Sequence, residues 1–183
     1  YSTIVNALTA KGAKGVVANL PYVTALPYFT TVPFNPLSNA VLGGGNVAVG
    51  QATVDALNTQ LYGPLKQALT AFGAGDRINL MSTTTANPLL IRDESLANLS
   101  AQLTAAFTPS LGAATAAFYG QIFGQARQAT KDDLVVLTTQ SVIGTAPTGI
   151  PAPLNKFGIT YPLQDKDVLT KDEILEVKTA TDA

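Results

Sequence analysis

The stretch STIVNALTAKGAKGVVANLP, residues 2–21, indicates the fold class of the chain. Its first half, residues 2–11, spaces apolar side chains as a helix does, and Gly12 then supplies a stop signal. Residues 15–21 form a short apolar run that is rich in β-branched side chains and ends in a proline, which is typical of a strand buried on both faces of a parallel sheet. A helix, a glycine turn and a buried strand make half of an α/β unit, so we expect an α/β fold.

Further helices and strands are predicted along the rest of the chain. The spacing of apolar residues predicts helices over 51–72, 94–107, 110–128 and 170–183, and short apolar runs predict strands over 87–93 and 133–138. The stretches 22–50 and 141–161 are rich in proline and glycine, so we expect loops there.

Local signals set the expected ends and breaks of these helices. Gly63-Pro64 lies inside the first of them, and because proline lacks a backbone donor we expect a kink or a break there. Asp93 is a candidate N-cap for the second helix, and Thr170 with Glu173 forms a capping-box sequence before the last. The third helix contains three glycines, which either weaken it or permit close contact with another helix: Gly112, Gly120 and Gly124.

The composition of the 183 residues excludes several kinds of chemistry. Hydrophobic residues make up 46% and charged residues 13%, so the chain has ample material for a core and does not have the composition of a disordered protein. A net charge of −1 disfavours nucleic-acid binding, and no apolar run is long enough to span a membrane. Because cysteine and histidine are absent, these residues hold no disulfide, no thiolate nucleophile, no Ser-His-Asp triad and no metal bound by cysteine or histidine.

Three motifs half-match functional patterns and are better explained as local structure. Residues 43–48 resemble part of a dinucleotide-binding fingerprint, but no convincing strand precedes them, so we expect a surface turn. Ser141 follows a predicted strand as a nucleophile would, but the G-x-S-x-G elbow and a histidine base are missing. The N-glycosylation pattern at 98–100 falls within a predicted helix, so we interpret it as coincidental.

Two clusters of carboxylates are candidates for acid–base chemistry or for a hard cation, namely Asp132-Asp133 and Asp165-Lys166-Asp167. Neither has EF-hand spacing, and both lie at predicted element boundaries, where aspartate usually caps a helix or a turn. We therefore expect structural roles for both clusters, and we predict no metal site and no cofactor.

Five separated segments resemble, in their order, a bacterial, envelope-associated or secreted subfamily of the SGNH (GDSL-type) ester hydrolases. The segments are GAKGVVANLP at 12–21, FTTVPFN at 29–35, NPLLIRD at 87–93, ATKDDLVVL at 129–137 and PLQDKDVLT at 162–170. The resemblance runs over nearly the whole chain, although none of these segments is the catalytic signature of the family. Tyr22 is a departure, because relatives more often carry aspartate at that position.

The resemblance implies a flavodoxin-like, three-layer α/β fold, a nucleophilic serine in a Gly-Asp-Ser motif, an oxyanion hole and a DxxHP motif. Since none of these motifs is present, we expect the chain to be the middle segment of such a hydrolase. Residues 1–34 would belong to the α/β core, 35–161 would be a mostly helical insertion with a short β-hairpin, and 162–183 would be a core helix. The parent protein would act on a carboxylic ester or acyl substrate, as an esterase or lipase, and would be a secreted protein or lipoprotein outside the cytoplasm.

The residues that line the substrate pocket are expected just after the first strand, because ligands of open α/β sheets bind beyond the carboxyl ends of strands. That strand ends at Pro21, so the candidates are Tyr22, Val23, Thr31, Pro33 and Asn35. The same side chains could instead only pack the insertion against the core. No catalytic residue is assigned, because no position matches a catalytic motif.

A second hypothesis is a non-enzymatic helical binding or scaffold module of the bacterial envelope. The absence of histidine and the low charge favour it. The two hypotheses differ in what the neighbouring gene sequence must contain: the first requires Gly-Asp-Ser upstream and Asp-x-x-His downstream.

Overall fold

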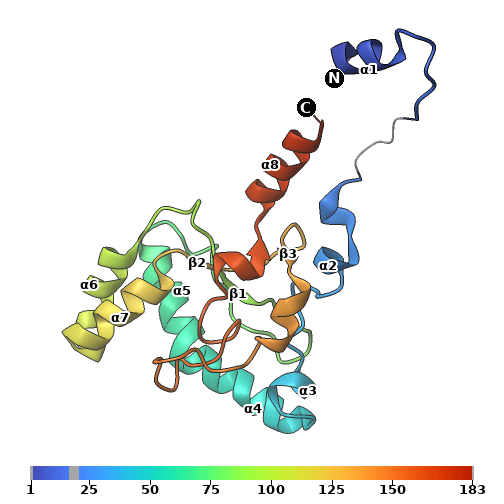
Figure 1. Ribbon diagram of the computed structural model, residues 1–183. Coiled ribbons are helices and arrows are strands. Elements are labelled where there is room, and N and C mark those ends of the chain that lie inside the picture. The colour runs from blue at the N-terminus through green and yellow to red at the C-terminus, as the bar shows by residue number, and fades with distance from the viewer. Residues whose placement is uncertain (1, 17–20, 183) are drawn as a thin grey trace.

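Helices surround two small antiparallel sheets in the computed structural model, which describes residues 2–16 and 21–182 (Figure 1). In the first sheet β1 (Leu90–Arg92) pairs with β2 (Ala126–Gln128), and in the second β3 (Leu134–Val135) pairs with β4 (Val168–Leu169). The predicted combination of helices and strands is therefore present. The prediction of a β-hairpin is wrong for the described residues, because both pairs are joined by long connections, which in the first sheet contain two helices.

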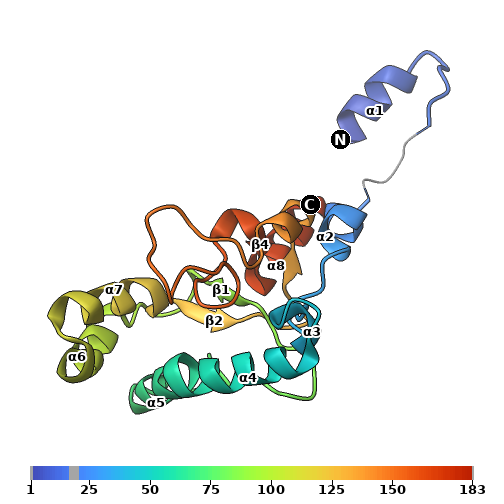
Figure 2. The same ribbon diagram turned by 90° about the horizontal axis from the view of Figure 1, so that it is seen from below.

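The N-terminal unit that suggested a parallel sheet is described only in part. α1 (Ser2–Thr9) confirms the helix predicted over 2–11, and it stands apart from the rest of the protein with no buried residue (Figures 1 and 2). The strand predicted over 15–21 lies largely outside the described residues, which omit 17–20. The parallel sheet stays a prediction.

Short helices occupy the stretch 22–50, for which the sequence predicts a loop. They are η1 (Val23–Ala25), α2 (Pro27–Thr30) and α3 (Asn39–Leu42), and α4 begins within the same stretch. Pro27 starts α2, since the first position of a helix needs no amide donor. The side chains of Ser38 and Asn46 cap the starts of α3 and α4 by accepting backbone amide protons.

The longest helical stretch is interrupted where the sequence predicts, at Gly63-Pro64. It consists of α4 (Val47–Leu57), one wide turn η2 (Asn58–Tyr62) and α5 (Gly63–Ala71). Because Pro64 has no amide proton, the helical ladder is already disturbed ahead of it, and the Gly63 amide bonds to the Asn58 carbonyl five residues earlier. The apolar stripe nevertheless faces the core, with four fully or almost fully buried members: Val54, Leu61, Leu65 and Leu69.

The helices α6 (Ser100–Leu111) and α7 (Ala113–Phe123) form a closely packed pair at one side of the protein (Figure 1). The first begins later than predicted because Asp93 binds Ser95 and Arg127 and caps no helix. The second ends earlier than predicted because the chain turns into β2. Of the two roles predicted for the glycines, close contact is confirmed at Gly120, where a Cβ atom would overlap the Ser100 carbonyl oxygen.

We expect Gly120→Ala to lower the free energy of unfolding by about 2 kcal/mol, because the added methyl group overpacks the contact between α6 and α7. The measurement is urea denaturation followed by circular dichroism. Gly15→Ala is the matched control, since a Cβ atom there meets nothing within 4 Å, and its effect should stay within about 0.5 kcal/mol. Equal effects of the two substitutions would contradict the proposed contact.

One hydrophobic core joins all three regions that the sequence analysis distinguished. It contains Val32 from residues 1–34, Leu90 and most other members from 35–161, and Leu163 from 162–183. The division into an α/β core and an insertion stays a prediction, but across both of its boundaries the side chains pack together. None of the described helices is long and apolar enough to cross a membrane.

The C-terminal part adds η3 (Leu137–Ser141), η4 (Asp165–Asp167) and α8 (Lys171–Asp182). One half of the predicted capping box forms at the start of α8, where the Glu173 carboxylate accepts the Thr170 amide at 2.6 Å. The Thr170 hydroxyl donates to the same carboxylate at 2.8 Å. α8 therefore has a fixed start, and it projects from the body on the side where residues 21–30 also leave it (Figure 1).

Candidate functional site

A half-buried guanidinium, that of Arg127, joins two buried carboxylates at the end of the first sheet. Its Nε donates to Asp93 Oδ2 at 2.6 Å, and its two terminal nitrogens donate to the Asp133 carboxylate at 2.7 Å each. Asp93 also accepts the Ser95 amide at 3.0 Å, and Asp133 accepts the Thr130 amide at 2.7 Å. Because each charge already has an oppositely charged partner inside the protein, we assign this cluster a structural role.

Hydrogen bonding keeps both of these carboxyl groups ionised in spite of their burial. Burial alone raises their pKa, but hydrogen bonds from Ser95 and Arg127 to Asp93, and from Arg127 and the Thr130 amide to Asp133, outweigh it and hold each pKa below its ordinary value. The bonds to the two carboxylates likewise raise the pKa of Arg127 against the effect of its own burial. All three groups are therefore charged at neutral pH.

We expect Arg127→Met to lower the free energy of unfolding by about 3–5 kcal/mol, since it leaves two buried carboxylates without a counter-charge. Arg92→Met is the matched control, because Arg92 pairs with Glu94 at an exposed position, and it should cost less than about 1 kcal/mol. Urea denaturation at pH 7 measures both variants. A loss for Arg127→Met no larger than that of the control would rule out the structural role.

The contribution of Asp133 should disappear in acid. Its native pKa is lowered, so below the ordinary carboxyl value of about 3.9 the unfolded chain binds a proton that the native protein does not, and stability falls as the pH falls. The difference in stability between wild type and Asp133→Asn should therefore be constant above about pH 5 and shrink below about pH 4. Denaturation curves between pH 7 and pH 2.5 test this, with the exposed neighbour Asp132→Asn showing only a small difference throughout.

The remaining candidates for chemistry have the local roles that the sequence analysis favoured. Asp132 forms an exposed ion pair with Lys131, and Asp167 accepts the Gln164 amide at 3.1 Å in the cap of η4. The Ser141 hydroxyl donates to the Thr138 carbonyl at 2.9 Å and has no base beside it. Within residues 2–16 and 21–182, no group of three or more acidic side chains could hold a metal ion.

The half-matched motifs also belong to turns and helix starts. Residues 43–46 connect α3 to α4, so a helix and not a strand precedes the glycines. The sequon lies at the start of α6, where Asn98 Oδ1 accepts the Ser100 amide at 2.9 Å, and not within a helix as predicted.

Of the five predicted pocket residues, Tyr22 alone lines one of the three hollows described below. Tyr22 is 43% exposed and lines a large groove beside α8. Val23 is exposed in η1, and Pro33 is exposed beyond α2. The Thr31 hydroxyl donates to the Pro27 carbonyl at 2.6 Å, and Asn35 is half-buried. A role for the last four in a pocket stays a prediction, because none of them lines that groove or the two smaller hollows found elsewhere on the described body.

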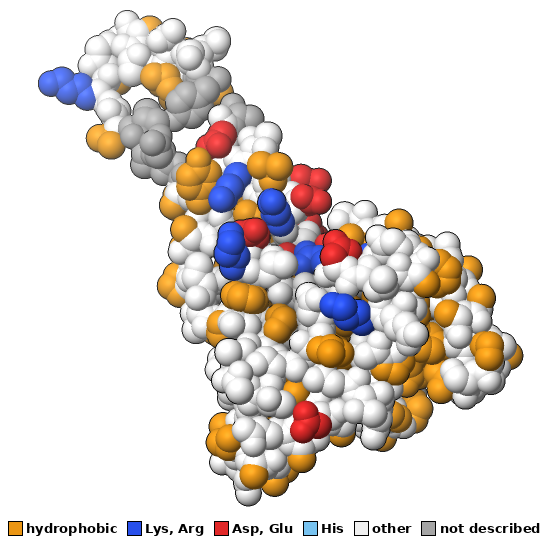
Figure 3. Space-filling view, turned by 180° about the vertical axis from the view of Figure 1, so that it is seen from behind, with side chains coloured by type: hydrophobic (Ala, Val, Ile, Leu, Met, Phe, Trp, Pro, Cys, Tyr) orange, Lys and Arg blue, Asp and Glu red, His pale blue; other side chains and the backbone are white. Residues whose placement is uncertain are grey.

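The large groove, which has a volume of about 760 Å³ and which we call the neck groove, lies between residues 22–25 and α8. Its wall combines apolar side chains with three lysines and one aspartate: Tyr22, Thr24, Ala25, Lys131, Asp132, Leu134, Lys171, Ile174, Leu175 and Lys178. Beside it the Tyr22 hydroxyl donates to Asp182 Oδ1 at 2.7 Å, and this hydrogen bond raises the pKa of Tyr22. On the face seen in Figure 3, charged side chains gather near this neck, while the lower body carries mostly uncharged and apolar ones.

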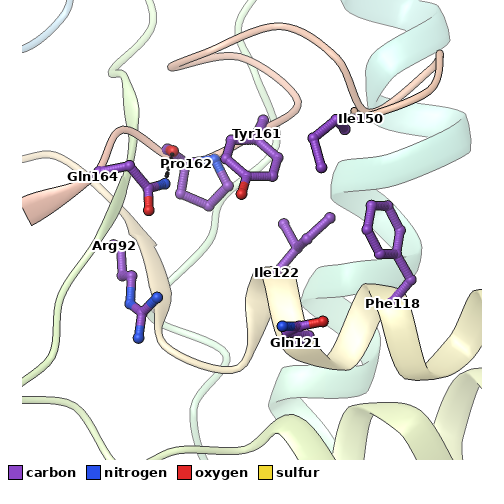
Figure 4. Close-up of a pocket in the computed structure, with 8 residues that line it drawn as sticks. All are labelled: Arg92, Phe118, Gln121, Ile122, Ile150, Tyr161, Pro162 and Gln164. Carbon is purple, nitrogen blue, oxygen red and sulfur yellow. Dashed lines mark hydrogen bonds between the residues drawn. The ribbon is translucent and has the colours of Figure 1, made fainter. Parts of the chain in front are cut away.

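A smaller hollow of about 140 Å³ lies between α7, β1 and the chain before η4 (Figure 4). Tyr161 packs edge-on against Phe157, and Figure 4 shows its hydroxyl pointing toward Ile122. Two of the polar side chains that line the hollow are engaged in part, since Arg92 Nε faces Glu94 at 3.3 Å and Gln164 Nε2 donates to the Pro162 carbonyl at 2.8 Å. The volume is below the roughly 300–1,000 Å³ of typical ligand sites, so we assign it no ligand.

Comparison with known proteins gives no counterpart, because no family model, no curated protein and no solved structure matches the chain. The groups that the sequence analysis missed are Arg127 as the partner of Asp93 and Asp133, and α8 as one wall of the neck groove. The sequence does not predict the ion pairs of Arg127, because an arginine and two aspartates spaced along the chain do not indicate that they meet in the fold.

Proposed function

We propose that the chain is the central part of an SGNH-type hydrolase that cleaves carboxylic esters, and that it supplies scaffold and pocket walls while the reacting groups lie elsewhere in the parent protein. The order of the five resembling segments supports this proposal. The fold of the parent would be a doubly wound, flavodoxin-like sheet, and its location outside the cytoplasm rests on the same resemblance.

The observation that carries the proposal is that the chain enters and leaves the body side by side. Tyr22 and Asp182 are 160 positions apart in sequence, yet their side chains share a hydrogen bond. The two segments assigned to the α/β core, residues 1–34 and 162–183, flank the proposed insertion, and segments of one core need to lie side by side because short connections join elements that are adjacent in space. Residues 22–25 and α8 belong to these two segments and are therefore the proposed junction with the rest of the host sheet.

The neck groove supports this junction because it leaves apolar side chains uncovered. Leu175 is 64% exposed on α8, and Tyr22 is 43% exposed opposite it. Exposed apolar surface of this kind marks a contact site when it is contiguous. We propose that the host sheet packs here, and that the predicted pocket wall at Tyr22 lies at its edge.

The chemistry of the proposed reaction must come from outside these residues. Acyl transfer by serine requires a base to take its proton, and the chain has no histidine. The two buried aspartates whose pKa is lowered, Asp93 and Asp133, are held by Arg127 and are not available to a substrate.

Two measurements test the proposal together. The gene should encode Gly-Asp-Ser upstream and Asp-x-x-His downstream of these residues, and the protein with both flanks should hydrolyse short p-nitrophenyl esters. The 183-residue chain should show no turnover above background, and Ser141→Ala should leave that background unchanged. If the flanks lack both motifs, the non-enzymatic helical scaffold replaces the hydrolase, and Ser141-dependent turnover would overturn both hypotheses.

The proposed junction has its own test. In the protein with both flanks, Leu175→Glu should lower stability by about 2 kcal/mol or more, because it buries a charge against the host sheet. In the 183-residue chain the same change should stay within about 0.5 kcal/mol. Leu80→Glu, at a position that is 55% exposed and outside the groove, is the matched control and should be mild in both. Equal effects of Leu175→Glu in the two proteins would exclude the junction.

A further inference from the structure

A second large groove lies on the opposite part of the body, between α3, α4 and the chain 143–160. We call it the loop groove, and its volume is about 550 Å³. It is lined by Val41, Leu42, Thr53, Leu57, Ile143, Gly144, Thr145, Ala152, Pro153, Asn155, Lys156, Ile159 and Thr160. This volume lies within the range of roughly 300–1,000 Å³ that small-molecule sites occupy, so the groove is large enough for a ligand.

The wall of the loop groove is mostly apolar and partly uncovered. Leu42, Leu57 and Ile143 are half-buried against the core, and Val41 is 57% exposed at the rim. The hydroxyls of Thr53 and Thr145 are already used, because they donate to backbone carbonyls at 2.8 and 2.7 Å. The Thr160 hydroxyl accepts the Lys156 amide at 3.1 Å. The wall therefore offers a ligand mainly apolar contact, together with the side chains of Asn155 and Lys156.

One charged side chain, that of Lys156, lines the loop groove. Lys156 is the only charged residue among those that line the groove, and it forms no ion pair with any residue of 2–16 or 21–182. The neck groove differs, because it holds three lysines and an aspartate. One unneutralised ammonium group beside an apolar surface is complementary to one negative charge on an apolar ligand.

The walls of the loop groove are held in place before any ligand arrives. The Gly144 amide donates to the Phe157 carbonyl at 2.8 Å, and the Phe157 amide donates to the Thr145 carbonyl at 3.0 Å. On the core side of the loop, the buried Tyr62 hydroxyl donates to the Ile159 carbonyl at 2.7 Å. The loop is thus tied both to itself and to η2, the turn that follows α4, which reduces the entropy lost on binding.

We infer that the loop groove binds an alkyl monocarboxylate, with the alkyl chain on the apolar wall and the carboxylate at Lys156 Nζ. The inference goes beyond the proposed function and does not depend on it. It concerns binding within the described body, and its test reads binding and not turnover.

The probe is octanoate, titrated into the 183-residue chain and followed by calorimetry and by NMR shifts. Binding should saturate, and hexanoate should bind about 15-fold more weakly, because each buried methylene contributes a factor of about four. Lys156→Gln should weaken octanoate about tenfold, whereas Lys156→Arg should retain it, and binding of the neutral 1-octanol should be unchanged by either. Lys166→Gln removes an exposed lysine outside the groove and should have no effect.

A steric variant separates the groove from any other apolar surface. Val41→Trp fills the rim of the groove from an exposed position and should abolish binding without unfolding the protein. Val49→Trp is the matched control, since Val49 is 51% exposed on α4 and does not line the groove. Unsaturable octanoate binding, equal behaviour of the two tryptophan variants, or unchanged affinity in Lys156→Gln would each overturn the inference. Failure of the ester assay would not affect it.

Discussion

The structure depends on satisfying the backbone of one fully buried segment, Leu89–Ile91. Its side chains are 0% exposed, so its amide and carbonyl groups have no access to water and must pair within the protein. On one edge Leu90 exchanges hydrogen bonds with the chain at Gly158 and Leu163, and on the other the Leu89 carbonyl accepts the Ala129 amide. Segments from distant parts of the sequence are thereby drawn to one short strand. The ion pairs of Arg127 with Asp93 and Asp133 then hold together the end of β1, β2 and the chain after β2 through directional, charge-assisted hydrogen bonds.

In the irregular segment 79–87, side-chain amides form the backbone hydrogen bonds that a neighbouring strand would otherwise form. Asn58 bonds both backbone groups of Met81, and Gln128 bonds both backbone groups of Asn79. Each amide uses one donor and one acceptor in the geometry of a peptide group, so this irregular segment can lie against η2 and β2 with its polar groups paired. This explains how so small an amount of sheet supports a continuous core, and why the described body is not a layered sheet structure.

Local signals in the sequence predicted local structure well, and long-range pairing poorly. The break at Gly63-Pro64, the role of Glu173 at the start of α8 and the close contact at Gly120 each depend on chemistry within a few residues or on one small side chain, and each is confirmed. The partner of β1 was missed because a strand of three residues does not specify which distant strand it joins. Asp93 was predicted to cap a helix for the same reason, since only the fold brings Arg127 to it. For the candidate site, Tyr22 was identified from chain order, but its partner on α8 was not.

The two large grooves differ in a way that separates their roles. The neck groove lies where the chain enters and leaves the body, and it combines an exposed leucine with three lysines and one aspartate, so an apolar patch lies there among several charges. The loop groove lies within the body, its walls are tied by backbone bonds, and its single cation is uncompensated. A surface of the first kind suits a large protein partner that buries apolar area, whereas one of the second kind suits a small anion with an apolar tail. Contact with a host domain and recognition of a small ligand can therefore coexist on this chain without competing for the same residues.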